Sequence, residues 1–243
     1  MLAEVNACST VAREKVTIVR GVTDSDPSED RERNGRDKPA QVLEFFDVRP
    51  GMRVLDLNAA TGYYAELLAR SVGPQGHVIA HNHPGAVAML GDAMSRRCGD
   101  GRLANVEPLL ARHNEMHLPP QSLDVVLMSM VYHDTYWYQK GVDWGPVDRQ
   151  SLLKDLYEAL RPGGVIGVID HVAIGGSDPE ISVMALHRID PRVVRRDFLG
   201  AGFMLEARSD LLRNPADDHT RGVFDPVIQG HTDRFVMRFR KPR

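Results

Sequence analysis

Three observations predict an α/β fold in which a largely parallel sheet carries helices on both faces. Five strand-like segments alternate with helical segments from residue 52 onward, and such alternation is typical of parallel sheets. The first strand, "MRVLDLN" at 52–58, is almost wholly apolar, as expected of a strand that is covered on both sides. The chain has 243 residues, of which 42% are hydrophobic and 26% charged. These values suit one globular domain.

The N-terminal segment differs from the rest of the chain. Residues 1–36 are polar and carry mixed charges without a helical or strand period. We therefore expect a partly flexible N-terminal extension at 1–36, followed by one domain at 37–243. The pattern changes at Pro39, which suits the first turn of a helix that "RPG" ends at 49–51.

The remaining elements follow from apolar runs and from Gly and Pro stop signals. Further helices are expected at 63–72, 85–97, 148–160 and 191–203. Strands are expected at 52–58, 77–82, 106–111, 123–131 and 165–172, with two closing strands at 203–209 and 233–241. Asp148 is a candidate N-cap residue. The Lys and Arg residues of the final strand favour a position at the edge of the sheet.

Composition excludes several classes of protein. The net charge is −3 with acids and bases mixed, so no basic field for nucleic acid or an anionic membrane is expected. No apolar run approaches the roughly 20 residues of a membrane span, and the first residues lack the layout of a signal peptide. Cys8 and Cys98 are the two cysteines, which fits a reducing compartment. We therefore expect a cytoplasmic protein.

Three motifs in order resemble those of the class I S-adenosylmethionine-dependent methyltransferases. They are "VLDLNAATGYYAELLA" at 54–69, "QSLDVVLMSMVYHD" at 121–134 and "LRPGGVIGVID" at 160–170. The resemblance runs from about Pro39 to Pro242. It implies a methyltransferase-like domain with a Rossmann-like, doubly wound, seven-stranded sheet, mostly parallel with an antiparallel last strand. It also implies S-adenosyl-L-methionine as the cofactor.

Shorter motifs resemble a narrower group, the bacterial predicted methyltransferases of undefined substrate. These motifs are "YHD", "DH", "LHRIDP", "LLRNPADD" and "TDRFVMRFRKP". The narrower resemblance implies the cofactor more firmly than it implies the reaction.

The turn after the first strand is the expected cofactor site, because ligands of such sheets bind beyond the carboxyl ends of the strands. Asp56 closes the strand and can accept hydrogen bonds, while Asn58 tolerates left-handed backbone. Ala60 fits if its φ stays negative, and Gly62 allows close packing. Tyr64 is the last of the residues expected to bind the cofactor at this turn. The alternative is a structural turn without a ligand. An NAD-type site is disfavoured because G-x-G-x-x-G is absent.

Two positions depart from the family, which usually places acids after its second and third strands. Asn82 stands where an acid binds the ribose hydroxyls, and Asn114 and Glu115 stand near the adenine position. Four histidines flank these two positions and could in principle bind zinc: His81, His83, His113 and His117. We expect no metal there, since no cysteine joins them and polar lining is the commoner role.

Residues after the fourth and fifth strands are the expected catalytic groups. His133 and Asp134 follow one strand, and His171 ends the other. A neutral histidine is suited to take a proton from an acceptor near pH 7, so His133 and His171 are candidate bases. For each histidine, the alternative is a structural role with a bond to the backbone.

The segment 132–144 is rich in aromatic residues and is expected to form a wall or lid over the acceptor. Tyr132, Tyr136 and Trp137 are its candidate contacts; the alternative is that the loop packs on its own domain. His187 and Arg188 are further candidates, because an arginine can hold a carboxylate or phosphate. Alternatively, Arg188 pairs with Asp190 and fixes the start of the next helix.

The combined prediction is methyl transfer from S-adenosylmethionine to a small molecule, with a histidine as general base. No nucleic-acid or membrane partner is expected, and a homodimer is left open. One alternative is a displacement or cyclisation that expels S-adenosylhomocysteine without methylation. Another is a non-catalytic protein that binds the cofactor.

Overall fold

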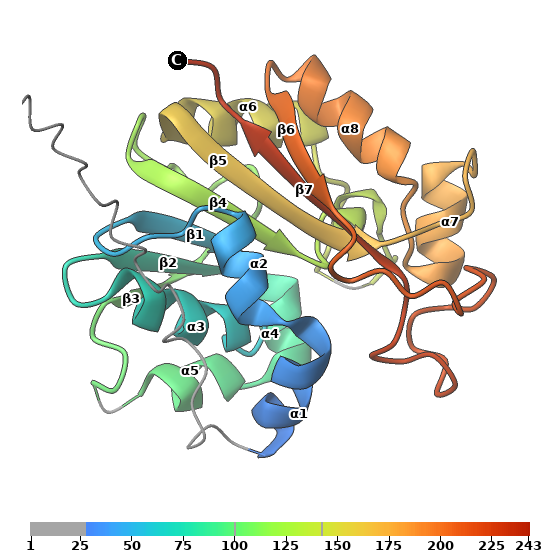
Figure 1. Ribbon diagram of the computed structural model, residues 1–243, viewed down its shortest axis with the longest axis horizontal. Helices are drawn as coiled ribbons and strands as arrows, with labels where there is room; N and C mark the ends of the chain where they lie inside the picture. The colour runs from blue at the N-terminus through green and yellow to red at the C-terminus, as the bar shows by residue number, and fades with distance from the viewer. Residues whose placement is uncertain (1–27, 100, 142) are drawn as a thin grey trace, which may run out of the picture.

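The computed structural model describes residues 28–99, 101–141 and 143–243, and within them the predicted sheet is confirmed. Seven strands lie in the order β3-β2-β1-β4-β5-β7-β6 (Figure 1). The pairings of β7 with β5 and with β6 are antiparallel, and the other pairings in this sheet are parallel. The strands are β1 Arg53–Leu57, β2 His77–Asn82, β3 Val106–Leu110, β4 Leu123–Ser129, β5 Leu160–His171, β6 Met204–Ser209 and β7 Arg234–Arg240.

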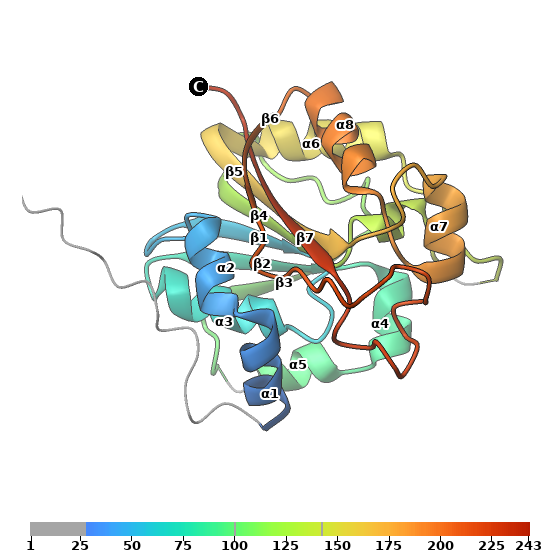
Figure 2. The ribbon, with the colours of Figure 1, turned by 45° about the vertical axis from the view of Figure 1, so that its right-hand side comes forward.

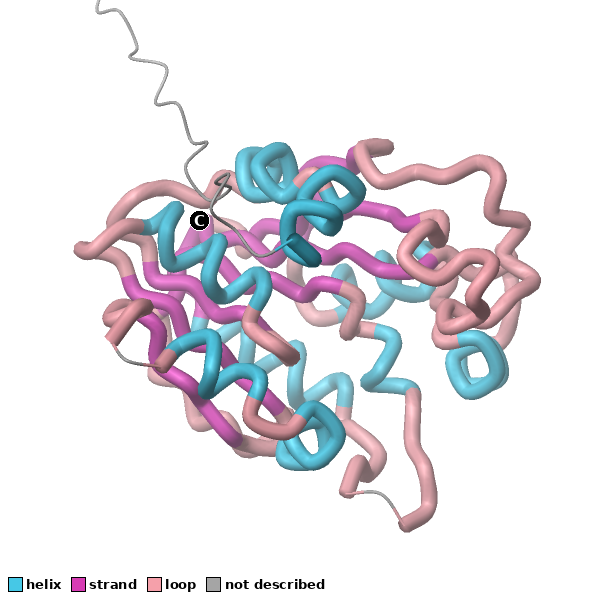
Figure 3. Tube along the Cα trace, turned by 90° about the horizontal axis from the view of Figure 1, so that it is seen from below, coloured by secondary structure: helices cyan, strands magenta, loops and turns pink. Residues whose placement is uncertain are grey.

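Helices cover both faces of the sheet, as Figure 3 shows. Leu55 on β1 packs with apolar residues of α6 and α8, whereas its neighbour Val54 packs with α2 and α3. This alternation gives each face its own core. The helices are α1 Ser28–Asp37, α2 Pro39–Phe45, α3 Tyr63–Val72, α4 Pro84–Leu90, α5 Ala93–Cys98, α6 Arg149–Ala159, α7 Pro179–Leu186 and α8 Pro191–Gly200, with the 3₁₀ turn η1 at His133–Tyr136.

The order of the strands positions the site. From β1 the chain proceeds outward to β2 and β3, and it then returns to the other side of β1 with β4 and β5. Strand order therefore reverses between β1 and β4, and crevices form at the carboxyl ends of strands around such a point. No described helix is long and apolar enough to cross a membrane.

The prediction that 233–241 forms an edge strand is wrong. β7 lies between β5 and β6, and the half-exposed β6 is the edge of the sheet. The arginines that suggested an edge have partners instead, because Arg238 and Arg240 each lie 2.7 Å from a carboxylate oxygen of Glu206 on β6.

The N-terminal segment also differs from expectation where the structure describes it. Residues 1–27 lie outside the described residues, but 28–37 form α1 rather than a loose extension. Asp30 pairs with Arg97 on α5, and Asp37 pairs with Arg234 on β7, at 2.6 and 2.8 Å. Ion pairs with the domain hold this helix, which explains why its sequence shows no apolar period.

One helical prediction needs correction, and one helix was not expected. The helix expected at 85–97 is two helices, α4 and α5, because the chain breaks at Gly91 with φ +61°. α7 was not predicted; it begins after Asp178, whose side chain accepts a hydrogen bond from the Ile181 N–H. Asp148 caps α6 as expected, accepting from the Ser151 N–H at 3.1 Å.

Candidate functional site

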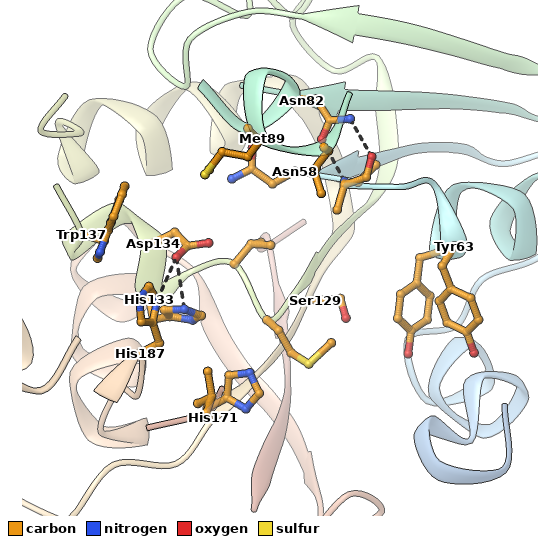
Figure 4. A pocket seen from close by; sticks show the side chains of 18 of the residues that line it. Asn58, Tyr63, Asn82, Met89, Ser129, His133, Asp134, Trp137, His171 and His187 are labelled. Atoms are coloured by element: carbon orange, nitrogen blue, oxygen red, sulfur yellow. Dashed lines mark hydrogen bonds and ion pairs between the residues drawn. The ribbon is translucent and has the colours of Figure 1, made fainter. Parts of the chain in front are cut away.

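A cavity of about 600 Å³ opens at the carboxyl ends of the central strands. This volume lies within the roughly 300–1,000 Å³ of small-molecule sites. Its two ends differ in chemistry (Figure 4). One end is the turn after β1 with Tyr63 and Tyr64 at the start of α3, and the other holds His133, Asp134 and His187. Figure 2 shows the 210–233 segment beside α4, and both contribute to the walls.

The turn after β1 adopts left-handed backbone at three positions. Asn58 has φ +52° and Gly62 has φ +85°, as their residue types suggest. The positive φ strains any other residue at Gly62, and a methyl group there would also displace the Met94 side chain, whose Sδ would lie 2.7 Å away. Ala60 has φ +53°, which contradicts the expectation of a negative φ. Left-handed alanine is strained by roughly 1–2 kcal/mol, so another residue must hold it.

Asn82 at the end of β2 is that residue. Its Oδ1 accepts a hydrogen bond from the Ala60 N–H at 2.8 Å, and its Nδ2 donates to the Ala60 carbonyl at 3.0 Å. These two bonds are the contacts of Asn82 in this structure, and its expected contact with ribose hydroxyls stays a prediction. The amide lines the cavity, but both of its groups are bound to the turn.

Three buried polar atoms of the cavity wall have no hydrogen-bond partner: Asp56 Oδ2, Asn58 Oδ1 and Ser129 Oγ. Burial raises the pKa of Asp56 to about 7, against a smaller opposing effect of the Arg33 charge. Unpaired buried polar atoms are rare and costly in folded proteins. A ligand with an ammonium group and hydroxyl groups would satisfy all three, so these residues fit the expected cofactor.

Asn114 and Glu115 are not among the residues that line the cavity, so the structure gives no support to their predicted contact with the adenine. Asn114 exchanges two hydrogen bonds with the backbone of Asp148 at 3.0 and 3.2 Å, because the chain after β3 turns toward α6. Glu115 is exposed. The buried residue of this stretch is His113, whose Nε2 accepts from Asn58 Nδ2 at 2.9 Å.

Two of the four histidines considered for zinc support the cofactor turn. His81 accepts at Nδ1 from the Asn58 N–H and donates at Nε2 to the Ala111 carbonyl. Burial lowers the pKa of His81 to about 4 and that of His113 to about 3, so both are neutral. His83 caps α4, and His117 is exposed.

His133 and Asp134 meet at the other end of the cavity (Figure 4). His133 donates from Nδ1 to Asp170 Oδ1 at 2.7 Å, and its Nε2 lies 3.1 Å from Asp134 Oδ1. Although burial opposes a charge, the carboxylates of Asp134 and Asp170 raise the pKa of His133 well above its usual range. His133 is therefore held as an imidazolium, whereas a neutral base was expected.

His171 ends β5 beside this pair and is the neutral histidine there. Its Nδ1 hydrogen-bonds with Thr232 Oγ1 at 2.7 Å, which leaves Nε2 free, and its side chain lines the cavity. Burial lowers its pKa to about 3, although the Asp170 carboxylate acts in the opposite direction. The structure thus separates two histidines that the sequence treated alike.

Of the predicted acceptor contacts, Trp137 and His187 line the cavity. Tyr132 and Tyr136 do not; both hydroxyls donate to Asp197 Oδ2 on α8, on the far side of η1. Arg188 does not either, because it is fully buried in a bidentate pair with Asp217 at 2.8 and 3.1 Å. The alternative partner Asp190 instead pairs with Arg192.

Comparison with known proteins supports the motif assignment. The family model of protein-L-isoaspartate(D-aspartate) O-methyltransferase matches residues 37–103. Ubiquinone/menaquinone biosynthesis C-methyltransferase UbiE of Vibrio campbellii is 30% identical over 129 residues, 53% of this chain and 45% of that protein. Arsenite methyltransferase of Halobacterium salinarum is 30% identical over 53% of this chain and 29% of its own. The matched segment thus covers less than half of either relative.

Solved structures agree on the fold. A SAM-dependent methyltransferase from Aquifex aeolicus superposes with a TM-score of 0.61 at 19% identity, covering 88% of this chain and 98% of that chain. Haemonchus contortus phosphoethanolamine N-methyltransferase 2, in complex with S-adenosyl-L-methionine, also superposes with a TM-score of 0.61. The sequence identity is 14%, and the match covers 85% of this chain and 53% of that chain. The chain therefore has the fold of solved S-adenosylmethionine-dependent methyltransferases, and part of it is similar in sequence to methyltransferase families.

The cavity also has wall residues that the sequence analysis did not predict. Arg33 on α1 stacks over the ring of Tyr63 at 3.8 Å and reaches the cofactor end. Val223 and Phe224 come from a loop before β7 and close the acceptor end, where Phe224 lies 5.1 Å from the ring of His187. No periodic pattern marks these residues. The one available signal for Phe224 was an apolar residue inside a polar loop.

Proposed function

We propose that this protein is a methyltransferase that transfers a methyl group from S-adenosylmethionine to a small-molecule acceptor. One observation carries the proposal: a single cavity connects the unpaired polar atoms of the turn after β1 with the histidines after β4 and β5. The names of the two curated relatives, a C-methyltransferase of quinone biosynthesis and an arsenite methyltransferase, support a small acceptor.

The cofactor end suits a zwitterion. Asp56 Oδ2 can accept from an ammonium group, while the first N–H groups of α3 favour a carboxylate. Arg33 adds a positive charge on the same side. The bound cofactor supplies a methyl group on a sulfonium, and the residues of the chain bind and orient it.

The acceptor end combines an apolar wall with polar groups. Trp137, Val223 and Phe224 form the wall, and Phe224 is 66% exposed, so it lies at the mouth. The wall excludes water and aligns the acceptor for an in-line displacement, in which alignment is the main requirement. An apolar or aromatic acceptor with one nucleophilic polar atom fits this arrangement.

His171 is the proposed proton acceptor. Its Nε2 is free and faces the cavity, whereas both nitrogens of His133 contact carboxylates. A hydroxyl that has accepted a methyl group carries a strongly acidic proton, so even a weakly basic imidazole can take it. His133 and Asp134 then act by charge and by positioning.

Two measurements test the proposal. The first is thermal unfolding with S-adenosylhomocysteine at millimolar concentration, which must raise the melting temperature if the native state binds it. The second is mass spectrometry of a small-molecule extract incubated with the protein and methyl-labelled S-adenosylmethionine. A product with one labelled methyl group is expected, and His171→Asn should suppress it without loss of S-adenosylhomocysteine binding.

A matched control is His77→Ala, which removes a histidine at the start of β2, away from the cavity. It should change neither measurement. No stabilisation by S-adenosylhomocysteine would overturn the proposal. Consumption of the cofactor without a labelled product would show that the protein catalyses another displacement instead of methylation.

A further inference from the structure

We propose that His133, Asp134 and His187 bind one divalent transition-metal ion, with Zn²⁺ as the first candidate, at the acceptor end of the cavity. Among residues 28–99, 101–141 and 143–243, no other group of three His, Cys, Asp or Glu side chains brings its ligand atoms as close together. The role given below to the ion rests on the proposed function, but the binding site itself does not.

The spacing of the three ligand atoms suits a metal. Asp134 Oδ1 lies 3.1 Å from His133 Nε2 and 3.8 Å from His187 Nδ1, and all three atoms lie within 4.8 Å of one another. Metal–ligand distances of about 2.1 Å place neighbouring ligand atoms roughly 3.0–3.5 Å apart. The distance to His187 Nδ1 exceeds this range by a few tenths of an ångström, and the His187 side chain is partly exposed.

The ring nitrogen of His133 that faces away from Asp134 is bound to a carboxylate, as is common for metal-binding histidines. Asp170 is fully buried and accepts from both His133 Nδ1 and the His133 backbone N–H, at 2.7 and 2.9 Å. A carboxylate on Nδ1 fixes the ring and directs Nε2 at the ion. In this structure it directs Nε2 at Asp134 and the cavity (Figure 4).

The backbone of His187 adopts an unfavourable conformation. It ends α7 with φ +52° and ψ +45°, a left-handed conformation that a non-glycine residue adopts rarely. The next residue, Arg188, is anchored by Asp217 and by the carbonyls of Val172 and Arg221. Strain of this kind persists where the surrounding structure enforces it, and it concentrates at functional sites.

Two neutral imidazoles and one carboxylate form a donor set typical of catalytic zinc, which keeps a further position open. Binding therefore displaces the proton that His133 Nε2 shares with Asp134 in the metal-free chain. Trp137 and Phe224 line the same cavity as the three candidate ligands. A hydroxyl or thiol acceptor bound there would lose its proton more easily because the ion stabilises the anion. The proton passes to His171 or water, and the oxygen or sulfur forms a bond to the methyl carbon. The methyl–sulfonium bond breaks, and S-adenosylhomocysteine leaves.

The test is a titration of the metal-free protein with Co²⁺, followed by the visible absorption of the bound ion. We expect one equivalent to bind to the wild-type chain. His187→Ala and Asp134→Asn should each weaken binding by more than about 100-fold, beyond the 10–100-fold typical of outer-shell changes. Both side chains are partly exposed, so these variants should fold. His77→Ala is the matched control and should bind as the wild type does.

Failure to take up one equivalent of Co²⁺ would overturn the site, as would equal binding by His187→Ala. The melting temperature with S-adenosylhomocysteine, measured with and without a chelator, separates the two proposals. If S-adenosylhomocysteine stabilises the chain while Co²⁺ does not bind, only the metal site is wrong. If Co²⁺ binds and S-adenosylhomocysteine does not stabilise the chain, the proposed function is wrong.

Discussion

The side chain of Asn82 holds Ala60 in the left-handed conformation by hydrogen bonds to both its N–H and its carbonyl, at 2.8 and 3.0 Å. Two departures from the family pattern are thereby one feature. An alanine stands at a position that favours glycine, and the asparagine that replaces the usual acid supplies the hydrogen bonds that keep the alanine there.

Ala60→Gly should stabilise the protein. Left-handed alanine costs roughly 1–2 kcal/mol, and the added flexibility of glycine in the unfolded chain offsets about 0.5–1 kcal/mol. The free energy of unfolding in urea should therefore rise by about 0.5–1 kcal/mol. Ala59→Gly is the control, because Ala59 lacks a positive φ, and it should destabilise the protein. A loss of stability in Ala60→Gly would contradict the strain at this position.

Asn82→Ala should destabilise the protein by about 1–3 kcal/mol, since two hydrogen bonds of about 0.5–1.5 kcal/mol each are lost. In the Ala60→Gly background the loss should be smaller by at least about 0.5 kcal/mol, because glycine holds the turn conformation without help. A double-mutant cycle in urea measures this difference. Additive effects of the two substitutions would show that Asn82 does not compensate for Ala60.

The affinity for S-adenosylhomocysteine should increase with pH around neutrality. Burial raises the pKa of Asp56 to about 7, and only the ionised carboxylate attracts the ammonium group of the ligand. Between pH 6 and pH 8 the ionised fraction rises roughly tenfold, which sets the expected change in Kd. Isothermal titration calorimetry at these two pH values measures it.

Two variants check the origin of this dependence. Asp56→Asn should bind with an affinity that does not change between pH 6 and pH 8. Arg33→Gln should move the midpoint to higher pH, because the Arg33 charge lowers the pKa of Asp56. A wild-type affinity that is constant over this range would rule out a role for the Asp56 charge.

Arg188→Met should destabilise the protein by about 3–5 kcal/mol, since it leaves the Asp217 carboxylate buried without its partner. Arg192→Met removes a surface arginine of a comparable Arg–Asp pair and should have little effect on urea unfolding. If Arg188→Met instead weakened only acceptor binding at unchanged stability, the original assignment of Arg188 to the substrate would be restored.

The sequence predicts the elements that depend on local patterns. Alternation of strands and helices gives the sheet, and the positive φ of Asn58 and Gly62 follows from their residue types. The positions of His133 and His171 follow from the ends of β4 and β5. These features need no information about distant partners.

Features that depend on distant partners could not be predicted. The φ of Ala60 depends on Asn82, which lies 22 residues away, and the burial of Arg188 depends on Asp217, which lies 29 residues away. β7 has the basic composition of an edge strand, yet it lies inside the sheet because Glu206 on the neighbouring β6 pairs with Arg238 and Arg240. The different charges of His133 and His171 depend on Asp134 lying against one ring and Thr232 against the other.

The ion pair between Asp37 and Arg234 can form only after the ribosome has synthesised β7, so it limits how early this fold can be completed. The two residues are 197 positions apart, and Asp37 is buried beside α3. At about 5–20 residues per second, a ribosome needs roughly 10–40 s to make Arg234 after it has made Asp37. During that interval the Asp37 carboxylate has no cation from β7. The helix that carries Arg33 to the cofactor end can therefore dock fully only late in synthesis.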